Sequence, residues 1–217
     1  MSRAAKCSAK DDTVDDTVRE SILAQALVAL RDEGLVVYPT ETFYAVGADA
    51  CSERALSRLF ALKRREGTKA VALIMGELDH ARQVAREIPS AARRLADQFW
   101  PGPLTIVLPA LPSVSPLLVG PTGGVGVRVS SHPVARALAL GLGRPLTATS
   151  ANLSGEAPAR TLAQAKAALG LSVDVYVDGG HLSAEFPSTV VAFEQGALTI
   201  LRRGAISEES LHAALSD

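Results

Sequence analysis

The sequence is poor in the residues that build cross-linked or membrane-embedded proteins. Its 217 residues include only two cysteines, Cys7 and Cys51, which are too few for a disulfide framework. Apolar runs are short and interrupted by proline or glycine, so no segment predicts a membrane-spanning helix. The N-terminal residues are mostly polar and acidic, without the apolar stretch of a secretory signal. We therefore expect a cytoplasmic protein that contacts no membrane.

An excess of positive charge and the spacing of metal ligands are also missing. The formal net charge of -1 argues against a general coating of nucleic acid, although a local basic groove remains open. The four histidines are widely dispersed, so we expect no metal site built by the protein. The motifs G-x-x-x-x-G-K-[ST], G-x-G-x-x-G, H-E-x-x-H and G-x-S-x-G do not occur. The common nucleotide-binding and hydrolase folds therefore lose support.

What the sequence does contain is enough apolar material for one folded domain. Hydrophobic residues make up 47% and charged residues 21% of the chain, as in ordinary globular proteins. Residues 1–14 lack apolar periodicity and predict a flexible arm. We expect one domain over residues 15–207 and a short helical tail over residues 208–217.

Helical and strand-like segments alternate along this domain. Thr17 and Glu20 form a capping-box pair at the start of an amphipathic helix that ends at Gly34. Further helices are expected after Ser52, near residues 77–87 and 90–99, after Pro133, and between Thr161 and Gly170. Strands are expected at residues 35–38, 70–75, 104–108, 125–129, 146–149, 173–177, 190–193 and 198–201. This interleaving favours an α/β domain with a single mixed sheet flanked by helices.

A first polar cluster follows the buried strand at residues 35–38. Thr40, Thr42 and Tyr44 place two hydroxyls and a phenol just beyond the end of this strand. Such groups can hold a small polar ligand at the edge of a sheet. The alternative is an ordinary turn in which the threonines satisfy one another.

A second cluster is basic and spans residues 63–69. Lys63, Arg65 and Lys69 follow a predicted helix closely enough to clamp an anion such as bicarbonate or a triphosphate. The alternative is a solvated helix end whose cations complement the helix dipole.

Two more clusters lie at predicted strand ends. Arg128 falls inside a strand-like segment, where a charge is costly unless it is paired. An amino-acid carboxylate would pair it, and a structural salt bridge to a glutamate explains it equally well. Residues 147–155 carry more hydroxyl and amide side chains than one turn requires, among them Ser150 and Asn152.

In this order and spacing, the segments resemble the YrdC-domain family. The resemblance rests on Tyr38-Pro39-Thr40-Glu41-Thr42, Lys63-x-Arg65, Arg128 followed by His132-Pro133, Ser150-Ala151-Asn152 with Ser154-Gly155, Pro187-Ser188-Thr189-Val190-Val191, and Ile200-Leu201-Arg202-Arg203-Gly204-Ala205-Ile206. Any one of these motifs is weak, whereas all of them in sequence are specific. Ser130 departs from the family pattern, in which proline is frequent at that position.

The resemblance implies a twisted mixed sheet with a large basic cavity, in the fold shared with DHBP synthase. It implies an L-threonylcarbamoyladenylate synthase, a nucleotidyltransferase that forms threonylcarbamoyl-AMP and pyrophosphate from L-threonine, bicarbonate and ATP. Mg²⁺ would accompany the nucleotide. The product would serve threonylcarbamoyladenosine modification of tRNA, with downstream threonylcarbamoyl transferase proteins as partners. The resemblance also implies a chain without the additional C-terminal domain of longer relatives.

By the same resemblance, individual residues acquire expected roles. Catalysis is expected from Lys63 and Arg65; ATP binding from Arg65, Lys69, Ser150, Asn152 and Arg202; and threonine binding from Thr40, Thr42, Tyr44, Arg128 and Ser188. No protein nucleophile is needed, because holding the substrates together and neutralising their charge would suffice. Two alternatives are a non-enzymatic module that binds tRNA or double-stranded RNA, and a carbamoyl-transferring relative like those within hydrogenase-maturation proteins.

Overall fold

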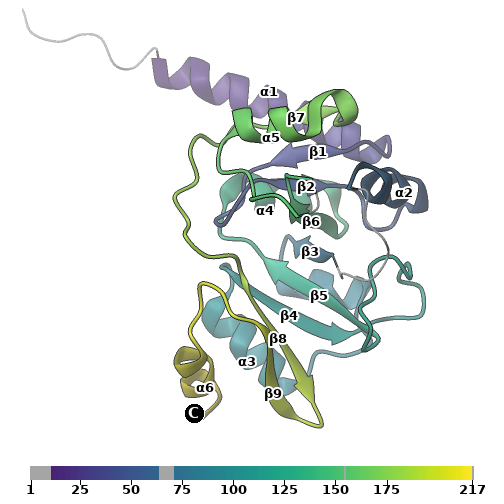
Figure 1. Cartoon of the computed structure of the whole chain (residues 1–217), viewed down its shortest axis with the longest axis vertical. Coiled ribbons are helices and arrows are strands. Elements are labelled where there is room, and N and C mark those ends of the chain that lie inside the picture. The colour runs from purple at the N-terminus through teal and green to yellow at the C-terminus, as the bar shows by residue number, and fades with distance from the viewer. Residues whose placement is uncertain (1–10, 64–70, 154, 217) are drawn as a thin grey trace, which may run out of the picture.

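A computed structural model describes residues 11–63, 71–153 and 155–216. Within these residues the chain forms one nine-stranded sheet in the order β7-β1-β2-β6-β3-β5-β4-β8-β9 (Figure 1). The strands are β1 (Val36–Tyr38), β2 (Ala45–Gly47), β3 (Ala72–Met75), β4 (Leu104–Pro109), β5 (Gly124–Val129), β6 (Leu146–Ser150), β7 (Val175–Tyr176), β8 (Thr189–Glu194) and β9 (Ala197–Arg202). Parallel and antiparallel neighbours alternate irregularly, so the predicted mixed sheet is confirmed.

The helices flank this sheet. They are α1 (Asp11–Arg31), α2 (Glu53–Leu62), α3 (Ser90–Phe99), α4 (Pro133–Leu142), α5 (Leu162–Leu169) and α6 (Glu208–Ser216), with the 3-10 helices η1 (Leu78–Gln83) and η2 (Gly170–Ser172). Local signals explain several of the helix starts. Ser52 accepts a hydrogen bond from the Ala55 amide at the start of α2, and Thr161 and Gln164 form a reciprocal capping box at α5.

Three details differ from the sequence-based expectations. Helix α1 begins at Asp11, so the predicted capping pair lies inside the helix rather than at its start. The segment predicted to be helical near residues 77–87 forms only the 3-10 helix η1. Strand β2 was not predicted, because three residues without alternation give little local signal.

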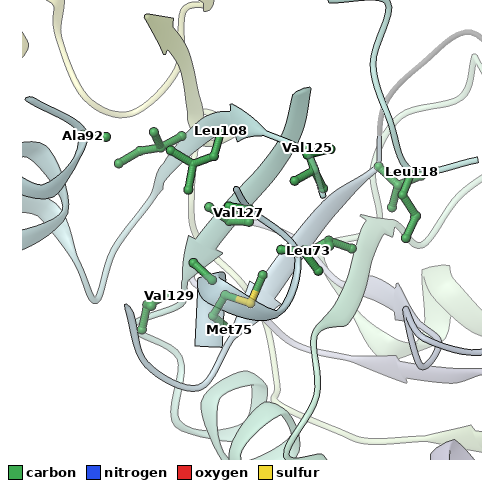
Figure 2. Close-up of a cluster of buried hydrophobic side chains, with 14 of the residues drawn as sticks. Leu73, Met75, Ala92, Leu108, Leu118, Val125, Val127 and Val129 are labelled. Carbon is green, nitrogen blue, oxygen red and sulfur yellow. The ribbon is translucent and has the colours of Figure 1, made fainter. Parts of the chain in front are cut away.

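The apolar side chains divide between the two faces of the sheet. On one face, α1 and α4 pack over Val36, Tyr38 and Leu146. On the opposite face, α2 and α5 cover the β1–β2 end of the sheet, and α3 and α6 cover β3, β5, β4 and β8. Figure 2 shows the cluster under α3 and α6, into which Leu73, Val127 and Leu108 of three neighbouring strands point.

The face that carries α1 and α4 also carries a strip of very small residues. Ala72 of β3 is paired with Ala148 of β6, and a Cβ on Gly126 of β5 would lie 3.9 Å from the Ala72 Cα. Ala72 and Ala148 are only half-buried. Beyond Gly126 on β5, Arg128 is paired with Ile74, whose side chain belongs to the layer under α4. Backbone is therefore close to the surface here, beside a charged residue.

One long connection crosses the molecule. Residues 177–188 lead from β7 at one edge of the sheet to β8 near the other edge (Figure 1). This connection brings Ser188, at its end, to the same part of the sheet as Arg128, because β8 is next to β4 and β4 is next to β5.

Candidate active site

Lys63 lies at the C-terminal end of α2 and reaches the loop that follows β6. Its ammonium is buried and donates hydrogen bonds to the Ser150 carbonyl at 2.6 Å, to Asn152 Oδ1 at 3.0 Å and to the Asn152 carbonyl. Burying a cation costs free energy unless acceptors replace its water. These three acceptors do so, and they tie together two segments that the sequence placed in one site.

The loop after β6 is further organised by its own side chains. Ser150 Oγ donates to Asn152 Oδ1 at 2.6 Å, and Asn152 Nδ2 donates to the Glu156 carbonyl at 2.6 Å. Ser150 and Asn152 were predicted to bind ATP together with Arg65 and Lys69. Arg65 and Lys69 lie outside the described residues, so their contribution stays a prediction.

Arg128 is buried on the other side of the small-residue strip and meets Glu41 from the loop between β1 and β2. Arg128 Nη1 lies 3.3 Å from Glu41 Oε1, and the side chains are only 5% and 13% exposed. The salt bridge to a glutamate, one of the two alternatives from the sequence, is therefore present. However, Arg128 Nε, Arg128 Nη1 and Glu41 Oε1 have no hydrogen-bond partner. The pair neutralises charge and leaves donors and an acceptor unused.

Glu41 is the residue of this cluster to which sequence reasoning gave no role. Its second carboxylate oxygen, Oε2, accepts a hydrogen bond from Ser130 Oγ, just beyond β5. The available signal was an acidic residue between two threonines in an otherwise neutral run. That signal becomes interpretable only when the partner across the fold is known.

A second guanidinium approaches from β9. Arg202 donates from Nε and Nη2 to the Ser188 carbonyl at 3.1 and 2.9 Å, and from Nη2 to Ser188 Oγ at 2.9 Å. Ser188 Oγ also lies 3.0 Å from Thr105 Oγ1 of β4. Burial and the nearby charge of Arg128 lower the pKa of Arg202 from its ordinary value. The charges of the two guanidiniums repel each other, so an anion bound nearby would stabilise both.

The remaining predicted residues are occupied within the protein. Thr40 Oγ1 donates to the Phe43 carbonyl at 2.7 Å and lies 3.0 Å from Thr42 Oγ1, so these threonines close a turn. Tyr44 is fully buried; its hydroxyl donates to the Gly180 carbonyl at 2.8 Å and accepts from the Gly179 amide at 2.9 Å. Contact with a ligand stays a prediction for all three residues, and Tyr44 holds the long connection in place.

Burial also sets the protonation of two residues near Glu41. It raises the pKa of Tyr38 far above the ordinary range, and this phenol donates to the Thr147 carbonyl at 2.8 Å. It lowers the pKa of His132, against the opposing effect of the Glu41 charge. His132 Nδ1 accepts from the Val134 amide at 3.2 Å and caps α4, which requires that nitrogen to be unprotonated.

The described residues contain no cluster of the side chains that most often bind metals. In the ranges 11–63, 71–153 and 155–216, no group of three or more His, Cys, Asp or Glu side chains is arranged to hold a metal ion. The same ranges contain no helix that is both long and apolar enough to cross a bilayer. Cations, hydroxyls and amides dominate the site, and they suit carboxylate, bicarbonate and phosphate groups.

Fold and candidate site together define a mixed α/β-sheet protein in which buried cations, hydroxyls and amides from distant segments meet. Comparison with known proteins then identifies its relatives. The sequence model of Sua5, YciO and YrdC proteins, described as "Telomere recombination", matches residues 28–204. The chain belongs to this Sua5/YciO/YrdC family, and the resemblance predicted from the sequence is confirmed.

Curated relatives cover most of the chain. The protein is 37% identical over 174 residues to the threonylcarbamoyl-AMP synthase of Chromohalobacter salexigens, an alignment that covers 80% of this chain and 94% of that protein. It is 35% identical over 179 residues to the threonylcarbamoyl-AMP synthase of Klebsiella pneumoniae, with 82% and 94% covered.

Solved structures agree with the fold. Pyrococcus abyssi Sua5 complexed with L-threonine superposes with a TM-score of 0.86 at 31% identity, covering 91% of this chain. This chain spans 58% of the length of that Sua5 chain. Escherichia coli YciO superposes with a TM-score of 0.78 at 27% identity, with 89% of this chain and 93% of that chain covered.

Proposed function

We propose that this protein is an L-threonylcarbamoyladenylate synthase that makes threonylcarbamoyl-AMP and pyrophosphate from L-threonine, bicarbonate and ATP. The family supports this activity, since relatives of comparable length are named threonylcarbamoyl-AMP synthases. The observation that carries the proposal is the contact of Lys63 with the loop at Ser150 and Asn152. A cation and small polar groups from distant parts of the chain meet there, as a site for bicarbonate and a triphosphate requires.

The residue types suit a reaction without a protein nucleophile. The α-ammonium of threonine first loses a proton, the resulting amine attacks bicarbonate, and the carbamate forms with loss of one water. A carbamate oxygen then attacks the α-phosphorus of ATP, and pyrophosphate leaves. The protein contributes by holding the substrates in line and by stabilising negative charge with preorganised donors. A classification as a nucleotidyltransferase follows from this second step.

The two clusters divide the substrates between them. Arg128, Ser188 and Thr42 would hold threonine, near the guanidinium of Arg202. Lys63, Ser150 and Asn152 would lie at the bicarbonate and triphosphate end, and we assign Arg65 and Lys69 to the same end. A large basic cavity between the two clusters belongs to the proposal.

Mg²⁺ fits this site as an ion carried by the nucleotide. Mg²⁺ commonly binds substrate phosphates and keeps several waters, so few protein carboxylates are required. The site is rich in cations and hydroxyls and has no acidic cluster among its described residues, which agrees with that mode. When bound, the ion would neutralise charge on the triphosphate.

The product is a reactive mixed anhydride and requires an acceptor. We propose that it is passed to tRNA through separate threonylcarbamoyl transferase proteins in the cytoplasm, so that tRNA is a partner of the pathway and a candidate partner of this chain. Binding of tRNA would have to use a local basic surface, because the formal net charge is -1.

A direct assay tests the activity. Purified protein is incubated with ATP, Mg²⁺, bicarbonate and labelled threonine, and the products are separated to detect a threonine-dependent adenylate and pyrophosphate. Omitting bicarbonate or threonine should abolish both products. Lys63→Met, which removes the buried ammonium, should lose most of this activity. Lys166→Met, at an exposed lysine, should leave the rate unchanged and serves as the matched control. RNA binding that is salt-sensitive, without any adenylate formation, would favour the non-enzymatic alternative.

A further inference from the structure

The unsatisfied polar groups of this protein are concentrated at one place. Among the described residues, the buried side-chain atoms without a hydrogen-bond partner are Glu41 Oε1, Arg128 Nε, Arg128 Nη1 and His80 Nδ1. Three of these four atoms belong to one ion pair. A buried polar atom without a partner costs about 1–3 kcal/mol, and more when it is charged. Such a concentration calls for a specific partner outside the protein's own side chains.

A purely structural ion pair would have a different geometry. Arginine and a carboxylate often form two parallel hydrogen bonds. Here Arg128 Nη1 and Glu41 Oε1 lie 3.3 Å apart, and neither of these atoms has a hydrogen-bond partner. Ser130 Oγ binds the other oxygen of Glu41 and so fixes the carboxylate in this position.

The unused atoms have opposite charge and are adjacent. Arg128 offers Nε and Nη1 to an anionic group, and Glu41 offers Oε1 to a cationic group. The guanidinium of Arg202 adds positive charge near Arg128, but it already donates to Ser188. The cluster therefore holds unused donors and an unused acceptor next to each other, on side chains that are only 5% and 13% exposed.

We propose that Glu41 is a specificity-determining residue that binds the α-ammonium group of an amino acid while Arg128 binds its α-carboxylate. This inference rests on the proposed function and deepens it, because it states why the site takes an amino acid rather than another small carboxylic acid. A zwitterion satisfies both charges of the pair as it enters. A hydroxy acid satisfies Arg128 but leaves Glu41 without a cationic partner in a buried position, which is unfavourable.

The test compares two ligands that differ only at this group. L-Threonine and the 2,3-dihydroxybutanoate of the same configuration are titrated calorimetrically into the wild-type protein, without ATP. The wild type should prefer threonine by roughly 10- to 100-fold, the usual effect of one hydrogen bond to a charged group. In Glu41→Gln, threonine should bind more weakly by a similar factor, and the preference should fall to near unity.

Matched variants separate selectivity from stability. Asp49→Asn removes another buried carboxylate, which pairs with Arg144 at 2.6 Å, and should keep the wild-type preference. Ser130→Ala leaves the Glu41 charge and should also keep a preference for threonine. If Glu41→Gln does not fold, as judged by circular dichroism, Glu41→Asp retains the charge on a shorter side chain and should show a reduced preference.

The outcomes distinguish the two proposals. If Glu41→Gln weakens both ligands by the same factor, Glu41 only positions Arg128, and the inference is overturned while the proposed function stands. An unchanged preference in a folded Glu41 variant overturns it as well. If the wild type binds neither ligand and forms no adenylate, the proposed function fails together with the inference.

Discussion

The two charged clusters of this protein differ in how completely their cations are satisfied. Lys63 donates to three acceptors of the loop at Ser150 and Asn152. Arg128 has one ionic contact and two nitrogens without a hydrogen-bond partner. A satisfied cation stabilises the protein around it, whereas an unsatisfied one gains most from a ligand. Lys63 therefore already holds its loop in place, whereas Arg128 has hydrogen-bonding capacity left over.

The largest loss of threonine binding and of activity is expected at Arg128, the cation with unused hydrogen-bonding capacity. Arg128→Ala should abolish measurable threonine binding and reduce adenylate formation by on the order of a hundredfold or more. It should also lower the free energy of unfolding by about 3–5 kcal/mol, because Glu41 remains as a buried, unpaired charge. Calorimetry and urea denaturation measure the two effects.

Arg144→Ala is the control for this experiment. Arg144 pairs with the buried Asp49, so its loss should also destabilise the protein, but threonine binding should persist. If Arg128→Ala still binds threonine, the comparison fails, because Arg128 would then serve only its salt bridge with Glu41.

A smaller but still large effect is expected at Lys63. Lys63→Met keeps the buried stem and removes the ammonium, which leaves the three acceptors of the loop without their donor. Pyrophosphate release should fall on the order of a hundredfold, as for the loss of one preorganised charged donor. Threonine affinity, measured without ATP, should change by no more than about twofold, since preorganisation at one cluster need not affect the other. An equal loss of threonine binding would mean that the clusters are not separate.

A third comparison concerns Tyr44, a neutral side chain whose hydroxyl is already hydrogen-bonded within the protein. Tyr44→Phe removes the hydroxyl that binds Gly179 and Gly180 and should destabilise the protein by about 1–3 kcal/mol. Threonine binding should weaken only slightly, because the hydroxyl acts through the position of the long connection. Urea denaturation and calorimetry of the same variant test both parts, and a complete loss of binding in a stable variant would assign Tyr44 a direct contact.

The smallest expected effect is a pH dependence of stability at His132, which lies near the Glu41–Arg128 pair. Burial lowers the pKa of His132 from its ordinary value of 6.5, so the unfolded chain binds a proton more readily than the folded one. Stability from this residue is therefore present above pH 6.5 and is lost as the pH falls below that value.

His132→Asn tests this sign. Asparagine can still cap α4 but does not titrate in this range. The unfolding free energy of the wild type should decline more steeply than that of the variant as the pH is lowered from about 7 to 5. Parallel curves would show that other groups account for the whole pH dependence.

The elements that could be predicted from the sequence are those with strong local signals. Apolar runs bounded by glycine or proline marked β4, β5 and the β8–β9 hairpin, and Ser52 and Thr161 marked two helix starts. Strand β2 was not predicted, because its pairing with β6 joins residues about a hundred positions apart and the sequence of Ala45–Gly47 carries no strand signal. Local propensity is overridden there by tertiary contacts.

The site was predicted in its motifs but not in its internal pairing. Lys63, Ser150 and Asn152 were placed together because the family resemblance groups them, and the structure joins them by hydrogen bonds. Glu41 could not be found in this way. Its hydrogen-bonding partner Ser130 lies 89 residues further along the chain, so its surroundings depend on the folded sheet.

The strip formed by Ala72, Ala148 and Gly126 has a consequence for how tightly a ligand can be positioned. Side chains can change rotamer, but the peptide groups of adjoining strands are held by the sheet at spacings of about 4.8 Å. With nothing larger than a methyl group on these residues, a bound molecule would rest against main chain of nearly fixed geometry. The fit on this side depends on the regular architecture of the sheet, and even one added methyl group, as in Gly126→Ala, would lie 3.2 Å from Thr105 Cγ2 and push that side chain aside.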